Sequence, residues 1–297
     1  MRVRWNPIVK KDLQIAARSM RISWGLFAYE AVLTMTFLLA LAVIQQQTGS
    51  FYSDGNVYHH LIYLFPVLAI AQVCIVTLIV PVITASSISG EKERQTFDIM
   101  LTTCMSPFSI VLGKVVSAVI HILFYVVGGL PIMALSFVVG GMEWSNLFYF
   151  ILTIVLLSVF SGSIGIFCSS VCRKSISAVV LSYVFYFVIF VLTFIPAVIK
   201  GLFVNKGVGE TMLLWLVNPI IFFEEFFMQI MSGESLFAGN FDKSEVGFLT
   251  YQLARGKTWM FVSGACILLL SVLFLLAAAW KVNPMHTSSA RRPGKKK

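Results

Sequence analysis

The amino-acid sequence predicts an all-α polytopic membrane protein, with six transmembrane helices, an amphipathic helix before the first and a re-entrant outer hairpin before the last. Three observations favour this fold class. Of the 297 residues, 58% are hydrophobic and only 12% are charged, whereas soluble domains carry about 25% charged residues. The apolar residues form repeated runs of about eighteen or more, long enough for a helix to cross a bilayer. Basic residues occur in alternate connecting segments.

The apolar runs define the expected spans. Several exceed the roughly twenty residues that cross hydrocarbon, so we expect those helices to tilt or to project into water. The expected spans are 23–45, 61–88, 107–139, 147–171, 176–200 and 258–281. The chain, 1–297, is therefore interpreted as a single transmembrane domain.

The distribution of lysine and arginine predicts the topology. The segment before the first span and the C-terminal tail are both rich in these residues. Two short loops add Lys92 with Arg94, and Arg173 with Lys174, whereas the loops at 46–60 and 140–146 have neither residue type. Because basic residues collect on the cytoplasmic side, both termini are expected in the cytoplasm.

Residues 211–231 present an alternative, because they are apolar and long enough for a seventh span. A seventh span would move the basic tail to the outside. The segment also holds the adjacent Glu224 and Glu225 and an internal proline, Pro219, each of which is costly in a lipid-facing helix. We therefore expect a re-entrant or interfacial hairpin within an outer segment, 201–257.

The two ends of the chain are basic. Residues 7–21 form an expected amphipathic helix, with Asn6 as N-cap and Pro7 in the first turn. Such a helix should lie in the inner membrane interface, attracted by anionic lipid headgroups. The tail, 282–297, is expected to be a solvated cytoplasmic anchor, and nucleic-acid binding is not expected from it.

Catalytic motifs are not apparent. Neither HExxH nor GxSxG occurs. Gly256, Lys257 and Thr258 resemble the end of a phosphate-binding loop, but Tyr251 stands where that loop needs its first glycine. We therefore predict no catalytic residue, no metal site and no ATP hydrolysis by this chain.

Small residues repeat every four positions in the fourth expected span. Ser161, Gly165 and Ser169 share one helical face, a pattern that lets membrane helices approach closely. Cys168 and Cys172 also share a face, yet no histidine or further cysteine stands beside them in the sequence to complete a zinc site. Helix packing is the expected role of this segment.

Several ionisable or polar groups are candidates for a transport pathway. Glu30 lies within the first expected span and His121 near the middle of the third. Intramembrane groups of this kind are functional candidates, but each is also explained as a polar contact between helices. Asn218, Glu224 and Glu225 could form an outer gate or could cap the hairpin.

The run GEKERQTFD, residues 90–98, places four charged residues between two apolar spans. Its composition, with Pro107 ending it, predicts a short cytoplasmic helix over 90–105. Such a helix with an apolar edge suits docking into a groove on a soluble partner. The alternative is a solvated turn between two spans.

The stretch ISGEKERQTFDIMLTTCMSPFSIVLGK resembles the signature of the type 2 ABC transporter permeases, the membrane subunits of many bacterial exporters. The resemblance extends to the N-terminal helix, which corresponds to the family's elbow helix, to residues 168–183 and to the hairpin. Gln95 departs from the pattern, because small residues are frequent there. The matching positions are Gly90, Glu91, Lys92, Glu93, Arg94, Thr96, Ser106, Pro107, Gly113 and Lys114.

This resemblance implies a permease in the bacterial cell membrane (inner or cytoplasmic) that pairs with a second permease, identical or different, and with separate ATPase subunits. ATP and Mg would bind to the ATPase subunits, and this chain would bind no cofactor. The 90–105 segment would be the coupling helix, seated on the ATPase. The implied coupling residues are Gly90, Glu91, Lys92, Glu93, Arg94, Thr96, Phe97 and Asp98.

The cargo is not readable from the sequence, although the apolar spans favour a hydrophobic or amphipathic peptide or drug. The main alternative is an ion-coupled transporter or channel without an ATPase, with Glu30 and His121 as its ion site. A membrane scaffold or immunity protein that only binds a partner is a third class.

Overall fold

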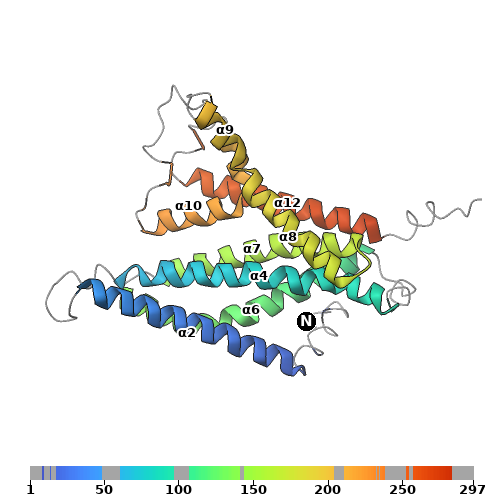
Figure 1. Ribbon diagram of the computed structural model, residues 1–297, viewed down its shortest axis with the longest axis horizontal. Helices are drawn as coiled ribbons and strands as arrows, with labels where there is room; N and C mark the ends of the chain where they lie inside the picture. Colours follow the sequence, from blue (N-terminus) through green and yellow to red (C-terminus); the bar gives the residue numbers. More distant parts are fainter. Residues whose placement is uncertain are drawn as a thin grey trace, which may run out of the picture.

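The computed structural model describes residues 9, 14, 18–48, 61–96, 107–140, 144–203, 211–231, 233, 235–237, 252–253 and 257–282. The regular structure of these residues is helical throughout. Most of the expected helix at 7–21, the segment 97–106, part of the outer segment 201–257 and the tail 283–297 lie outside this set. The helices are α2 Met20–Thr48, α4 Leu64–Glu93, α6 Pro107–Gly140, α7 Trp144–Val171, α8 Ser175–Leu192, α9 Ile195–Phe203, η1 Thr211–Val217, α10 Pro219–Met231 and α12 Thr258–Val282 (Figure 1).

Six helical segments of the described chain are long and apolar enough to cross a membrane, which confirms the predicted fold class. Five of them coincide with α2, α4, α6, α7 and α12, and the fifth span in chain order, Ser175–Lys200, combines α8 with most of α9. The remaining apolar segment is a bent pair, in which η1 and α10 meet at 89°. This bend has the geometry of a broken span or a re-entrant loop.

Helix α7 lies at the centre of the bundle. It packs against α4, α6, α8 and α12, and it is the most buried of the six candidate spans. Figure 1 shows α7 directly beside α4 along much of their length. The largest apolar cluster joins side chains of these helices to α10, including the buried Phe65, Phe150 and Phe160.

The close approach of α4 and α7 depends on the small residues predicted from the sequence. A Cβ atom on Gly165 would overlap Oγ1 of Thr84 and lie 3.0 Å from the Thr84 Cβ. One turn further, Oγ of Ser169 accepts hydrogen bonds from the backbone N–H groups of Ile88, at 2.9 Å, and Ser89, at 2.8 Å. The predicted packing role of this face is confirmed.

The bent pair is attached to the bundle by buried polar contacts. Asn218 is fully buried, and its Oδ1 accepts the Ile220 N–H at 2.9 Å, which makes it the N-cap of α10 ahead of Pro219. Its Nδ2 donates to Thr193 Oγ1 at 2.7 Å and to the Phe190 carbonyl at 3.2 Å. Asn218 therefore joins α10 to the end of α8.

Candidate functional site

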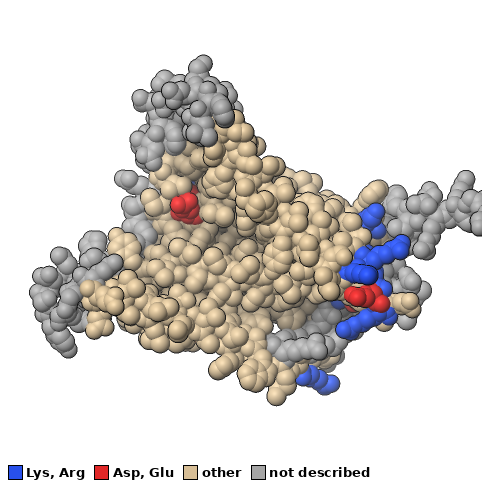
Figure 2. All heavy atoms as spheres, in the orientation of Figure 1, with Lys and Arg blue, Asp and Glu red and all other residues tan. Residues whose placement is uncertain are grey.

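The charged run begins inside α4 rather than after it. The residues from Gly90 to Glu93 form the last turn of α4, so within the described chain no separate helix begins at Gly90. Figure 2 shows that most of the basic side chains in this view lie at the end of the molecule where α4 ends and α8 begins, with acidic atoms among them. This turn is the first part of the candidate site.

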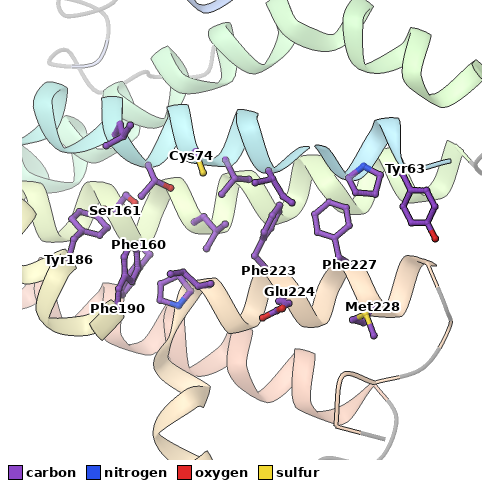
Figure 3. Close-up of a pocket in the computed structure, with 18 of the residues that line it drawn as sticks. Tyr63, Cys74, Phe160, Ser161, Tyr186, Phe190, Phe223, Glu224, Phe227 and Met228 are labelled. Carbon is purple, nitrogen blue, oxygen red and sulfur yellow. The ribbon is translucent and has the colours of Figure 1, made fainter. Parts of the chain in front are cut away.

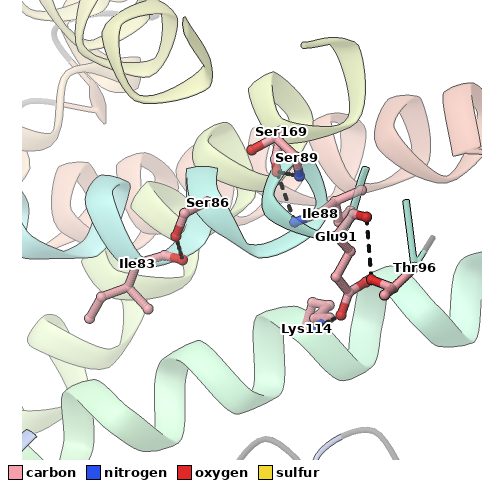
Figure 4. Close-up of polar contacts among 8 residues, drawn as sticks. All are labelled: Ile83, Ser86, Ile88, Ser89, Glu91, Thr96, Lys114 and Ser169. Carbon is pink, nitrogen blue, oxygen red and sulfur yellow. Dashed lines mark hydrogen bonds and ion pairs between the residues drawn. The ribbon is translucent and has the colours of Figure 1, made fainter. Parts of the chain in front are cut away.

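Glu91 connects α4 to α6. Its Oε1 accepts a charge-assisted hydrogen bond from Lys114 Nζ at 2.9 Å, and the Lys114 side chain is only 7% exposed (Figure 4). Charge-assisted bonds in partly desolvated surroundings are stronger than neutral ones. The ion pair therefore fixes the end of α4 against the beginning of α6.

Lys92 connects α4 to α7. Its Nζ donates to the backbone carbonyls of Ser169, Ser170 and Cys172, at 3.4 Å for Ser169 and 3.5 Å for Cys172. These carbonyls belong to the C-terminal end of α7, where the last groups of a helix have no partner within the helix. A cation here is also favoured by the helix dipole. Lys92 thus caps α7 from the neighbouring helix.

Glu93 connects α4 to α8. Its Oε2 accepts hydrogen bonds from the backbone N–H of Ser175, at 3.2 Å, and from the Ser175 hydroxyl, at 2.8 Å. Ser175 is the first residue of α8, and the preceding Lys174 supplies no side-chain cap. A carboxylate at a helix N-terminus satisfies a free N–H and complements the dipole. Gly90 lies beside this contact, because a Cβ atom added to it would be 3.5 Å from Ser175 Oγ.

Helix α4 ends in a Schellman motif. The Thr96 N–H donates to the Glu91 carbonyl at 3.0 Å, and the Gln95 N–H donates to the Lys92 carbonyl at 3.2 Å. Gln95 has a φ of 59°, in the left-handed region that favours glycine. Gln95, which departs from the family pattern, is therefore the residue at which the chain reverses direction. Arg94 is exposed, and Phe97 and Asp98 lie outside the described residues.

The second part of the candidate site is a pocket of about 1060 Å³. Helices α4, α7, α8 and α10 line it, and most of the lining is apolar (Figure 3). Glu224 is exposed at this pocket, whereas its neighbour Glu225 is fully buried. Glu225 Oε2 accepts the Leu236 N–H at 2.8 Å, so the two adjacent carboxylates differ in surroundings and contacts.

The contacts of Glu30 and of His121 involve different residues. Glu30, on α2, lies against Gly128 of α6, where a Cβ would be 2.7 Å from its Oε1. That oxygen is buried and has no hydrogen-bond partner among the described residues. His121 Nδ1 is 2.7 Å from the carbonyl of Ser117, one turn earlier on its own helix. His121 therefore has a local structural contact.

Several residues of the site were not identified from the sequence. Lys114 is matched only as part of a motif, and neither Ser175 nor Tyr186 is singled out by the sequence. Each lies in a different helix from its neighbours at the site. The one usable signal was the position of Ser175 directly after Lys174, at the beginning of an apolar run.

Comparison with known proteins identifies the family. Residues 31–281 match the family model described as ABC-2 family transporter protein. None of the curated proteins matches the chain. The matched segment covers most of the chain and comprises the six candidate spans except the start of the first and the last residue of the sixth. It is a transmembrane permease unit without an ATPase domain. The chain therefore belongs to the ABC-2 family of transporter membrane proteins.

Proposed function

We propose that the chain is the permease subunit of an ATP-driven exporter in the bacterial cell membrane, with both termini in the cytoplasm. Two permease chains, identical or different, enclose the substrate pathway. Separate ATPase subunits bind ATP and Mg and dock on the segment that follows α4. Family membership supports the permease assignment.

One observation carries the coupling proposal: the last turn of α4 is attached to three other helices. Glu91 binds Lys114 of α6, Lys92 caps α7 and Glu93 caps α8. A displacement of the segment after Thr96 is therefore delivered to α6, α7 and α8 together. In this mechanism Glu91, Lys92 and Glu93 transmit the motion within the subunit.

In this proposal the residues beyond that turn make the contacts with the ATPase. Arg94 is exposed, and Phe97 and Asp98 follow it in the sequence. We assign the charged contact to Arg94, with Phe97 as the apolar contact. Thr96, whose Oγ1 donates to the Glu91 carbonyl at 3.3 Å, holds the start of this segment against α4.

The test separates docking from transmission. The permease is purified with its ATPase, and both co-purification and substrate-stimulated ATP hydrolysis are measured. Arg94→Glu is expected to lose the ATPase subunit. Glu93→Ala is expected to keep the ATPase subunit but to lose stimulation, and Ser175→Ala to lose part of it, because Ser175→Ala removes the hydroxyl bond and leaves the backbone N–H bond. The double variant should be no worse than Glu93→Ala.

Ser177→Ala is the matched control, since Ser177 is an exposed serine in the same first turn of α8. It is expected to leave stimulation unchanged. Unchanged co-purification and transport in Arg94→Glu would refute the docking role. Additive losses in the Glu93 and Ser175 variants would refute the transmission role.

A second candidate function is ion-coupled transport without an ATPase. The observation that favours it is the buried Oε1 of Glu30, which has no hydrogen-bond partner among the described residues. In that case transport would continue without ATP and would stop in Glu30→Gln. Export that requires ATP and persists in Glu30→Gln would exclude it.

A further inference from the structure

The pocket between α4, α7, α8 and α10 has a composition that defines a class of ligand. Among the described residues that line it, Glu224 alone carries a charge. Figure 3 shows Glu224 on α10 between the two ends of the pocket, with Tyr186 and Ser161 toward one end and Tyr63 toward the other. Its volume of about 1060 Å³ is at the upper limit for sites that hold drug-sized molecules, about 300–1,000 Å³.

Aromatic rings form much of the remaining lining. Phenylalanines come from three helices, and a tyrosine lies at each end. Ring faces attract cations, and the attraction is larger where water is excluded. The aromatic residues that line the pocket are Tyr63, Phe160, Tyr186, Phe190, Phe223 and Phe227.

Two buried polar residues lie at one end of the pocket. The Tyr186 side chain is 4% exposed, and its hydroxyl has no hydrogen-bond partner among the described residues. Because that oxygen has almost no accessible surface, Tyr186 offers a ligand its ring and not its hydroxyl. Ser161 lies at the same end of the pocket and is also buried.

Other occupants match these features less well. A lipid tail would fill the apolar volume but would leave the Glu224 carboxylate beside hydrocarbon. An anionic ligand would be repelled by Glu224 and by the negative ring faces. Only a cation with an apolar body uses both the carboxylate and the rings.

We infer that this pocket binds a monovalent lipophilic cation, with its charge beside Glu224 and its aromatic or alicyclic body among the phenylalanines. As a statement about the exported cargo, the inference rests on the proposed function. As a statement about binding, it concerns this chain alone and is tested without an ATPase.

The experiment measures equilibrium binding of radiolabelled tetraphenylphosphonium to the purified protein in mild detergent. Tetraphenylborate, which has the same shape and the opposite charge, is the matched competitor. Saturable binding is expected, and tetraphenylborate should compete at least about tenfold more weakly than unlabelled tetraphenylphosphonium. Glu224→Gln should weaken cation binding about tenfold, whereas Glu224→Asp should retain most of it.

Three outcomes would overturn the inference: absence of saturable cation binding, equal competition by the two ions, or unchanged affinity in Glu224→Gln. A pocket filled by a lipid tail or by a second copy of the chain gives the first of these outcomes. If Glu224→Gln fails to fold, the comparison of the two ions on the unaltered protein decides. Failure here leaves the export proposal standing, because that proposal is tested by Arg94→Glu and ATPase co-purification.

Discussion

The polar groups near the two ends of α4 differ in the contacts that they make. At its C-terminal end, three consecutive charged residues each bind a different helix, namely α6, α7 and α8. Near its other end, α4 lines a pocket in which the buried Tyr186 hydroxyl has no partner in the described chain and Glu224 is exposed. Both regions belong to the same bundle and share α4, α7 and α8.

The difference separates polar groups that hold the fold from polar groups that are available to a ligand. Charged side chains that are already bound to neighbouring helices, as Lys92 and Glu93 are, have little left to offer another molecule. An exposed carboxylate at a pocket, such as that of Glu224, can still pair with a cationic ligand. Charge in a sequence therefore does not by itself mark a contact surface.

The largest effect on stability is expected at Lys92, in the turn that joins α4 to α7. Lys92→Met keeps the length of the side chain but leaves the carbonyls at the end of α7 without their donor. We expect a loss of about 1–2 kcal/mol of stability, moderated because the ammonium is partly exposed. The thermal unfolding midpoint in detergent should fall, and the decrease should be much smaller in Lys92→Arg. A midpoint equal to that of the unaltered protein would show that the capping contact contributes nothing.

A smaller effect of opposite sign is expected at Gln95. Gln95→Gly places the residue with no left-handed penalty at a φ of 59°, so α4 should end in the same motif with less strain. We expect a gain of about 0.5–1 kcal/mol, partly offset by the greater freedom of glycine in the unfolded chain. Gln95→Ala serves as the comparison and should give no gain. Equal unfolding midpoints for the two variants would contradict the assigned conformation.

The smallest effect is expected in the pocket. Tyr186→Phe removes a hydroxyl that has no partner in the described chain, so the free energy of unfolding should change by less than about 0.5 kcal/mol or should rise. Affinity for tetraphenylphosphonium should be unchanged, because the ring remains and the hydroxyl oxygen has almost no accessible surface. A clear loss of stability in this variant would mean that the hydroxyl is satisfied within the protein.

The helices could be predicted from the sequence because hydropathy and length are properties of consecutive residues. The expected span 258–281 and helix α12, Thr258–Val282, agree closely. The main difference is at the end of α4, which continues to Glu93, whereas the expected span ends at residue 88. Hydropathy excludes the polar residues there, but their contacts with α6, α7 and α8 keep them helical.

The contacts of the site could not be predicted in the same way. The partners of Lys92 and Glu93 lie about eighty residues further along the chain, and no local pattern links them. The motif shows that charges are present but not which helix each one faces. Tyr186 lies in a mostly apolar helix, so no periodicity indicates that it lines a pocket. By contrast, the four-residue spacing of Ser161, Gly165 and Ser169 is local, and the predicted close packing is found.

The tight crossing of α4 and α7 has a consequence for how sequences of this kind can diverge. At Gly165 a side chain would overlap Thr84, whereas a Cβ on Gly162 would make an ordinary contact, 3.5 Å from the Thr84 Cγ2. Related sequences should therefore accept alanine or serine at position 162 while position 165 remains glycine. Where position 165 does change, position 84 should change with it to alanine or glycine, so that the two positions vary as a pair.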